Sequence, residues 1–442
     1  MKLPHALFPL IAIVIGSTIG LAPQSAGASN ASAQVALDWN LAAVSAVRAA
    51  TTTDGVAAGA PPRHLYQTEG LVYMSYVQAA AYDAVMKISH RYQLYHHFKA
   101  PSRDASLAAA VISASYHSLV FYLSDPAGTL AAKYESSIAA LPPGKETKRG
   151  IAVGLAAAID IERLRAGDGR NAPVSDACPV PANPPTPGAY LCPPSPSIQA
   201  LQTPWVASMR PFLLRSSSAF RVPPPPSLAS ETYTSNLAET RAYGAANSSV
   251  RTADQQAIAL FWNMNVINQF NQTLRDAATQ HGMDLVDTER LLTMGEMVTT
   301  DAGIACFDSK YHYLFWRPVT AIRADGNPGD ANWSPLVATP NHPEYPAAHG
   351  CVTSAMGQTL AAALGTENLN VTFPGAANAA GTQLTSRTYA TVSDLTSEIV
   401  NARVWIGFHY RNSVIAGESL GTAAARWALA RYFQPTDEEG DD

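Results

Sequence analysis

Apolar residues recur at three- and four-residue spacing through most of this chain, which is the period of an amphipathic helix. The pattern is strongest in the alanine-rich first part of the sequence. It predicts five helices, at residues 36–57, 71–89, 105–124, 128–140 and 145–166.

Helical periodicity resumes at about residue 230. Thr252 with Gln255 has the pattern of a capping box in front of an apolar run. The later helices are predicted at 287–316, 351–364, 391–406 and 412–433, and residues 371–390 are predicted to form a loop. Sustained helical periodicity without clear β-hairpin signals predicts an all-α protein of packed helical bundles.

Prolines crowd the segment between the two helical parts, residues 167–230. Such a density of proline excludes both helices and central strands. Trp205 and Phe212 could pin the segment over a bundle as an ordered wrap that borders the site. A linker between two halves is the alternative, and the sequence leaves both open.

The N-terminus has a lysine, an apolar run from about Ala6 to Leu21, and then small residues. This pattern predicts a signal peptide at 1–33, cleaved after Ala28 or Ala33, and therefore a secreted or periplasmic protein. An uncleaved membrane anchor is the alternative. We expect one helical domain at 34–436, with N-terminal helices at 36–166 and C-terminal helices at 231–433, and an acidic, disordered tail at 437–442.

Charged residues make up 14% of the chain and the net charge is −5. This balance argues against a nucleic-acid partner and against a polybasic membrane-binding surface. No segment after the N-terminal run is apolar enough for a membrane span, so no stable insertion is expected after cleavage.

The four cysteines fall into two pairs along the sequence. Cys178 and Cys192 bracket a proline-rich turn, and in an exported chain we expect them to form a disulfide. Cys306 and Cys351 could pair as well, or remain as two buried thiols.

Polar residues that suit an anion are concentrated between Lys310 and His409. Lys310 and Arg317 lie seven residues apart, which is two turns on one helix face, and Pro318 should end that helix. A lysine is a compact point charge, whereas the arginine fork can hold two oxygens of a tetrahedral oxyanion.

Two further clusters follow in the sequence. A proline-broken loop leads into a helix that begins near His349, where free backbone N–H groups and the small residues Ala347 and Ala348 would let an anion approach. Arg403 lies near the end of another helix, and a break at Gly407 would bring His409 to the same place.

The chain resembles a superfamily that joins vanadium-dependent haloperoxidases with type 2 phosphatidic acid phosphatases and bacterial acid phosphatases. The resemblance rests on the order of the residues that match the family motifs, which are Lys310, Arg317-Pro318, Pro346, His349, Arg403 and His409. The flanking sequences FWRPVTAIR, HPEYP and ARVWIGFHYR are most similar to the bacterial haloperoxidase branch.

The chain departs from the family motif at two places. Ala347-Ala348 replaces Ser-Gly, so one hydroxyl donor is missing, although the backbone N–H of Ala348 remains. Such a bond to a charged group is worth roughly 1.5–3 kcal/mol. Ser413 stands where the family often has an aspartate that would orient the last histidine, which puts the basicity of His409 in question.

The resemblance implies an oxidoreductase that carries vanadate and no haem, with phosphate as a competitor for the site. Lys310, Arg317, Arg403 and the Ala348 N–H would hold the oxyanion, with His409 as the axial vanadium ligand and His349 as the acid–base group. Hydrogen peroxide, a halide and a small organic acceptor would be the substrates. A histidine at position 342 resembles the bromoperoxidases, which implies that bromide is preferred to chloride.

Several other interpretations fit the same residues. An acid phosphatase would use His409 as the nucleophile and His349 as the acid, and a degenerate site would bind an oxyanion without turnover. The arginines could instead pair with Asp301 or Asp308. His342, Glu344 and His349 could hold a metal ion, although their spacing fits no standard zinc motif.

Overall fold

A computed structural model of the chain describes residues 26–54, 56, 61–125, 127–175, 177–179, 186–192, 200–326, 330–376 and 385–436. The first half contains α1 (Ala26–Ala49), α2 (Gln67–Ser89), α3 (Leu107–Tyr122), α4 (Thr129–Ala139) and α5 (Lys145–Leu164). These helices confirm the five predicted from the apolar period. The first one ends eight residues earlier than predicted, because the β-branched Thr51–Thr52 forms a short strand, β1, paired with β2 (Arg63–His64).

The second half begins with a short 3-10 helix, η1 (Pro204–Ser208). The α-helices that follow are α6 (Glu231–Gly244), α7 (Ala253–Phe261), α8 (Val266–Gln280), α9 (Leu285–Tyr313), α10 (Pro318–Ala324), α11 (Ala348–Leu364), α12 (Val392–Trp405) and α13 (Arg411–Leu429). Thr252 caps α7 in the predicted capping box. The all-α prediction is therefore confirmed.

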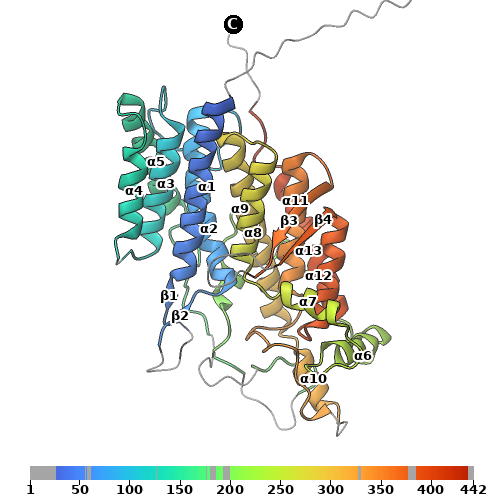
Figure 1. Cartoon of the computed structure of the whole chain (residues 1–442). Helices are drawn as coiled ribbons and strands as arrows, with labels where there is room; N and C mark the ends of the chain where they lie inside the picture. Colours follow the sequence, from blue (N-terminus) through green and yellow to red (C-terminus); the bar gives the residue numbers. More distant parts are fainter. Residues whose placement is uncertain are drawn as a thin grey trace, which may run out of the picture.

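The buried helix α9 lies at the centre of the molecule and packs against α1, α2, α8, α11 and α13 (Figure 1). Helices α3, α4 and α5 lie on one side of α1 and α2, and α11, α12 and α13 lie on the other side of α9 (Figure 1). One continuous apolar core extends from Trp39 in α1 to Leu395 in α12. The two helical parts of the chain thus share a single core.

The loop predicted at 371–390 is wrong. Asn368–Pro374 (β3) pairs antiparallel with Ser386–Thr391 (β4) across a connection that includes residues 377–384, which lie outside the described part of the chain. Leu369, Val371 and Phe373 alternate with more exposed residues along β3. This alternation with a period of two is typical of a strand. It was overlooked because a run of small residues, which is typical of a loop, follows it.

Residues 200–230 of the proline-rich segment form an ordered wrap rather than a linker. Trp205 and Phe212 are buried in the main core. The carboxylate of Asp301, in α9, accepts hydrogen bonds from the backbone N–H groups of residues 212–214 at 2.6–2.8 Å. The wrap is therefore attached to the central helix by a buried charge as well as by aromatic side chains.

Both cysteine pairs are disulfides. Cys178 and Cys192 close the proline-rich turn with a Cα–Cα distance of 5.7 Å, as predicted. Cys306 and Cys351 join α9 to α11 with a Cα–Cα distance of 6.3 Å, which resolves the alternative that the sequence left open. The second disulfide ties together the two helices that carry Lys310 and His349.

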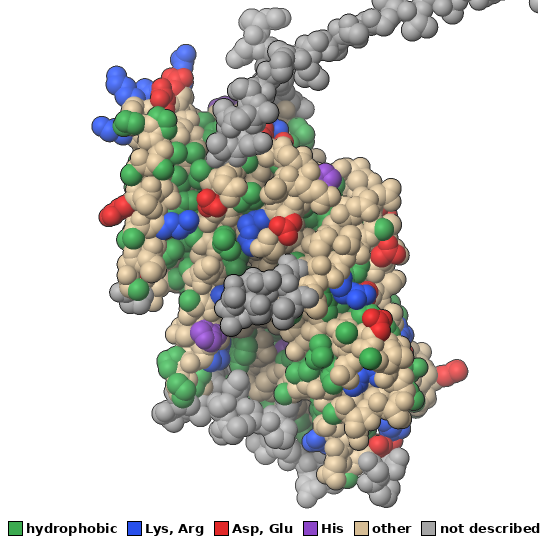
Figure 2. Space-filling model, in the orientation of Figure 1, with side chains coloured by type: hydrophobic (Ala, Val, Ile, Leu, Met, Phe, Trp, Pro, Cys, Tyr) green, Lys and Arg blue, Asp and Glu red, His purple; other side chains and the backbone are tan. Residues whose placement is uncertain are grey.

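Within the described residues no helix combines the length and apolarity that crossing a membrane requires. The apolar run of the predicted signal peptide lies outside the described residues, and so does the acidic tail. Charged side chains of both signs are scattered over the face shown in Figure 2 and form no patch of one sign.

Candidate active site

Lys310 and Arg317 reach the site from two different elements. Helix α9 ends at Tyr313, Leu314 adopts a left-handed conformation with φ 46°, and Arg317 caps the next helix, α10. The prediction that one helix carries both cations on one face is therefore wrong. Pro318 at the first position of α10 explains the break, because proline favours a helix start and leaves Arg317 extended.

His349 lies in the first turn of α11, as predicted: the helix begins at Ala348, and Ala347 is its N-cap. The first backbone N–H groups of this helix have no intrahelical acceptor, which makes its start a suitable place for an anion. Helix α11 is held close to α13 because Gly350, Gly417 and Gly421 lie at their crossing. A Cβ at Gly350 would stand 2.5 Å from the Val414 carbonyl oxygen, so only glycine allows this approach.

Arg403 and His409 come together because α12 ends before the histidine. Trp405 is the last residue of α12, and Gly407 turns the chain with φ +83°. At Gly407 a Cβ would also lie 2.5 Å from the Gly244 carbonyl oxygen, so the turn needs glycine for two reasons. The predicted break at Gly407 is therefore confirmed.

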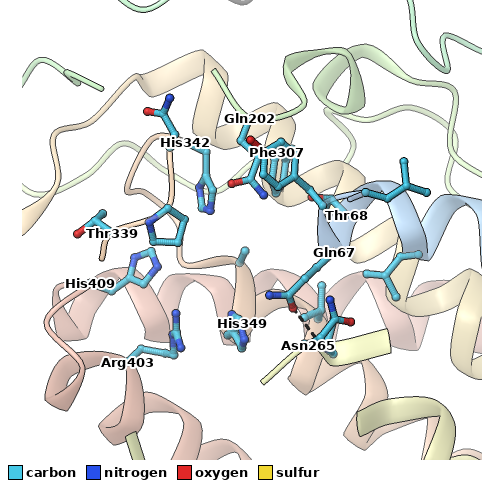
Figure 3. A pocket seen from close by; sticks show the side chains of 18 of the residues that line it. Gln67, Thr68, Gln202, Asn265, Phe307, Thr339, His342, His349, Arg403 and His409 are labelled. Carbon is cyan, nitrogen blue, oxygen red and sulfur yellow. Dashed lines mark hydrogen bonds between the residues drawn. The ribbon is translucent and has the colours of Figure 1, made fainter. Parts of the chain in front are cut away.

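A cavity of about 600 Å³ lies over these residues, and His342, His349, Arg403 and His409 all line it (Figure 3). Ala348 also lines the cavity. Lys310 and Arg317 do not line it but lie behind the loop that forms its base. Lys310 Nζ donates to the carbonyl oxygens of Pro343 and Glu344 at 2.9 Å each.

Three cations are buried here without a carboxylate partner. Lys310, Arg317 and Arg403 have at most 2% of their surface exposed. Among the described residues no carboxylate lies within salt-bridge distance of any of them. Burial, together with the charge of Arg317, lowers the pKa of Lys310 well below its usual value, and the same causes lower the pKa of Arg403 to about 9.

Buried polar atoms at the same place lack a partner. Neither Nε2 of His349 nor Nε of Arg403 has a hydrogen-bond partner among the described residues. A buried polar atom without a partner is costly, and an oxyanion that carries a hydroxyl would give Arg403 an acceptor and His349 a donor. The residues present therefore fit a tetrahedral oxyanion such as vanadate or phosphate.

The partner of His409 was not predicted from the sequence. Nδ1 of His409 lies 2.9 Å from a carboxylate oxygen of the fully buried Glu344, which also accepts the Tyr410 backbone N–H at 3.1 Å. Nε2 of His409 lies 3.2 Å from the guanidinium of Arg317. Because arginine can only donate and an ionised carboxylate can only accept, the proton of the neutral ring sits on Nδ1 and the lone pair sits on Nε2.

Electrostatics favour this neutral form of His409. Burial and the charges of Arg317, Lys310 and Arg403 lower its pKa well below the usual value. Burial raises the pKa of Glu344 to about 7, although Lys310, Arg317 and the Tyr410 N–H oppose this rise. Ser413 also opposes the rise in the pKa of Glu344. The residue at the position of the family aspartate therefore lies near Glu344, the carboxylate that contacts His409 in this protein.

His342 lies beside the predicted site, as the resemblance implied. Its ring packs against Phe307 at 5.4 Å, and its Nδ1 lies 3.1 Å from the Pro343 carbonyl oxygen. A guanidinium nitrogen of Arg317 lies 3.0 Å from Nδ1 and 3.3 Å from Nε2 of the same ring. Burial and Arg317 lower the pKa of His342 well below the usual value, so the ring is neutral.

Two alternative interpretations of the sequence are wrong. Asp301 binds the backbone of the wrap and Asp308 pairs with Arg221, so neither aspartate neutralises Arg317 or Arg403. Within the described part of the chain, no group of three His, Cys, Asp or Glu residues is placed to hold a metal ion, which excludes the triad of His342, Glu344 and His349.

Comparison with known proteins shows which proteins this region resembles. Residues 290–438 match the family described as the vanadium chloroperoxidase second helical-bundle domain. This region contains every cation and histidine of the site, so the resemblance that the motifs indicated is confirmed.

Individual relatives agree with this class. The chain is 31% identical over 144 residues to the vanadium chloroperoxidase of Curvularia inaequalis, a match that covers 26% of this chain and 24% of that enzyme. A bacterial vanadium-dependent iodoperoxidase structure superposes with a TM-score of 0.73 at 18% identity, covering 93% of this chain and 98% of the other. A holo bacterial vanadium-dependent chloroperoxidase gives 0.67 at 20% identity, with coverages of 82% and 91%. At such identities the structures show a shared fold.

Proposed function

We propose that this protein is a vanadate-dependent haloperoxidase that uses hydrogen peroxide to oxidise a halide, with bromide preferred. The observation that carries the proposal is the set of three buried cations beside a neutral histidine whose Nε2 carries a lone pair. A buried positive cluster needs an oxyanion, and a fixed imidazole lone pair can serve as a metal ligand.

Vanadate would be held by Lys310, Arg403, the Ala348 N–H and His409 Nε2, and Arg317 would act through its charge. Bound vanadate supplies a Lewis-acidic centre that activates hydrogen peroxide for two-electron oxidation of a halide. Lys310 and Arg403 each have a donor left over after their contacts with backbone carbonyls, whereas Arg317 is already fully engaged. We infer that Arg317 orients His409 and His342, while Lys310 and Arg403 supply most of the free positive charge.

His349 is the residue that moves a proton in this proposal. The overall reaction, X⁻ + H₂O₂ + H⁺ → HOX + H₂O, consumes one proton. Burial together with Arg403 and Lys310 lowers the pKa of His349 well below its usual value, so the ring is neutral and can accept a proton from peroxide at Nε2 before passing it on.

The test is to titrate the vanadate-free protein with orthovanadate and to measure bromide oxidation by hydrogen peroxide beside phosphate-ester hydrolysis without vanadate. We expect bromide oxidation to appear in proportion to bound vanadate. The Arg403→Gln variant should lose both vanadate affinity and activity, whereas Arg411→Gln, which breaks a pair with Glu239 outside the cavity, should keep both. Vanadate binding without bromide oxidation would contradict the peroxidase activity and would indicate a protein that only binds an oxyanion.

An acid phosphatase is the second candidate, and one observation favours it. The sequence argued against a phosphohistidine because Ser413 replaces the orienting aspartate, yet Glu344 holds His409 in the orientation that a nucleophile needs. Hydrolysis of phosphate esters by the vanadate-free protein, blocked by vanadate, would favour this activity over the peroxidase.

We also propose that the protein is exported. The N-terminal apolar run supports this, and so does the Cys178–Cys192 disulfide, since such bonds persist in oxidising compartments. Fractionation of producing cells, followed by N-terminal sequencing of the mature chain, tests the proposal. Intact Met1 on a cytoplasmic product would contradict it.

A further inference from the structure

The cavity over the anion site is much larger than its two small substrates require. Its volume of about 600 Å³ lies in the range of pockets that enclose organic ligands, roughly 300–1,000 Å³. A water-sized molecule occupies only about 30 Å³. Hydrogen peroxide and a halide ion would therefore fill a small part of this space.

The walls of the cavity differ from its base. Among the described lining residues there is no lysine, aspartate or glutamate, and Arg403 at the base is the one arginine. Leu71, Val266, Phe307 and Val352 form apolar wall surface. Uncharged walls of this kind suit a neutral and largely apolar molecule.

Two amide side chains on this wall are fixed in one orientation. Gln67, in the first turn of α2, accepts the Val266 backbone N–H at 3.0 Å, and Asn265 caps α8 by accepting the Ile267 N–H at 3.0 Å. A backbone N–H can only donate, so each amide must turn its oxygen to the helix. Both NH₂ groups remain without a hydrogen-bond partner among the described residues.

Figure 3 shows Gln67 and Asn265 beside each other, across the cavity from His409, with His349 between them and Arg403. Two NH₂ donors are therefore presented to the cavity by residues from α2 and α8, whereas the oxyanion ligands come from α9 to α13. The donors stand on the opposite wall from the proposed vanadate ligands and cannot belong to that ligand set.

We propose that Gln67 and Asn265 form a subsite for the carbonyl oxygen of a neutral aromatic ketone whose ring is made electron-rich by a donor substituent such as an alkoxy group, and that this compound is halogenated in place. The inference rests on the proposed function for its oxidant. The ring carbon gives an electron pair to the halogen of hypohalous acid, a C–X bond replaces a C–H bond, and the ring proton leaves with the hydroxide as water: ArH + HOX → ArX + H₂O.

The binding test uses the vanadate-free protein, so it does not depend on the proposed activity. Calorimetry compares 4′-methoxyacetophenone with 4-isopropylanisole, which has nearly the same shape but no carbonyl. We expect the ketone to bind about fivefold to tenfold more tightly, as one or two neutral hydrogen bonds provide. In the Asn265→Asp variant, which keeps the helix cap but replaces the donor with a carboxylate oxygen, this preference should disappear.

Gln67→Met removes the second donor without adding a charge, and Gln272→Met on the outer face of α8 is the matched control. Loss of the ketone preference in Gln67→Met, but not in Gln272→Met, supports the subsite. Equal binding of the two compounds by the parent protein overturns it, and so does an unchanged preference in both cavity variants.

A turnover test then examines halogenation in place. Iodide oxidation, followed as triiodide without an organic acceptor, should be the same within twofold in parent and Gln67→Met, while the KM for the ketone rises about fivefold or more. Excess taurine, which consumes free hypobromous acid, should suppress bromination of the ketone less in the enzyme reaction than with reagent hypobromous acid. Equal suppression would overturn halogenation in place. Ketone binding without any halide oxidation would mean that the proposed function fails while the subsite stands.

Discussion

At the scale of single residues, Glu344 is the side chain that sets the state of His409. It is the carboxylate that contacts the proposed ligand histidine, and it comes from the loop before α11 rather than from α13, where the family motif has its aspartate. Its backbone carbonyl also accepts from Lys310, so one residue connects a cation of the site with the histidine. Such partners orient a ligand and increase its basicity.

We predict that Glu344→Gln weakens vanadate binding by about tenfold to a hundredfold, the usual effect of removing a partner of a metal ligand. The glutamine oxygen can still accept from His409 Nδ1–H, so the loss would come from the missing charge. Calorimetric titration with vanadate measures it. Glu239→Gln, which removes a surface partner of Arg411, is the control and should bind vanadate like the parent. Equal vanadate affinities in the parent and both variants would show that Glu344 does not support vanadate binding.

His342→Phe is predicted to raise chloride oxidation relative to bromide oxidation. A neutral polar ring at this position accepts from Arg317 and keeps the cavity hydrated, whereas a phenyl ring would exclude water and free the Arg317 donor, which strengthens the local positive charge. Steady-state rates with chloride, bromide and iodide test this. His312→Phe, at an exposed position of α9, should leave the halide ratios unchanged. Unchanged halide ratios in His342→Phe would contradict a role of His342 in halide preference.

At the scale of elements, the crossing of α11 and α13 determines where His349 lies. Gly417 and Gly421 face α11, and a Cβ at Gly421 would collide with the backbone carbonyl of Cys351. Both glycines therefore allow the two helices to pack closely. The Cys306–Cys351 disulfide also ties α11 to α9, so this helix is held to both of its neighbours.

Gly421→Ala should therefore destabilise the protein by roughly 1–3 kcal/mol or more, the usual cost of overpacking. Gly303→Ala is a matched control in another buried helix, because a Cβ there would meet its nearest neighbour at an ordinary 3.7 Å. That change should be neutral or stabilise by up to about 1 kcal/mol, since alanine is the better helix former. Urea unfolding measures both changes, and similar free energies for the two variants would contradict the packing argument.

At the scale of the whole molecule, the central helix carries acidic groups in the apolar core. Burial raises the pKa of Glu289 to about 8 and the pKa of Glu296 to about 8, the latter although Asn271 donates to it at 2.6 Å. An unfolded chain releases these protons near pH 4.3. The folded protein therefore holds more protons than the unfolded chain up to about pH 8, and rising pH favours unfolding.

We predict that the free energy of unfolding falls by roughly 1–3 kcal/mol per pH unit between about pH 6.5 and 8, since each such group contributes up to about 1.4 kcal/mol per unit. Below pH 6.5 the buried histidines act in the opposite direction, because their lowered pKa values favour the unfolded chain as the pH falls. Denaturant titrations across this range test the slope. Glu289→Gln should reduce it, and the exposed Glu135→Gln should not.

The sequence by itself determined the helical class and most helix positions, because a buried helix leaves a local period of apolar residues. It also indicated the candidate site residues, since Lys310, Arg317, His349, Arg403 and His409 stand in a recognisable order. The helix break at Gly407 and the Cys178–Cys192 disulfide were predicted because their signals lie within a few residues of each other.

Only the tertiary structure decided which distant groups meet. Glu344 lies 65 residues from His409, and the contact between them depends on how α11 packs on α13. Its one local signal is a carboxylate in the otherwise uncharged loop NHPEYP. Gln67 and Val266 are 199 residues apart in the sequence, yet Gln67 and Asn265 face one cavity because α2 and α8 both pack on α9. Side-chain chemistry and helical period are local properties of a sequence, whereas partners and cavities arise from packing between segments that the sequence keeps apart.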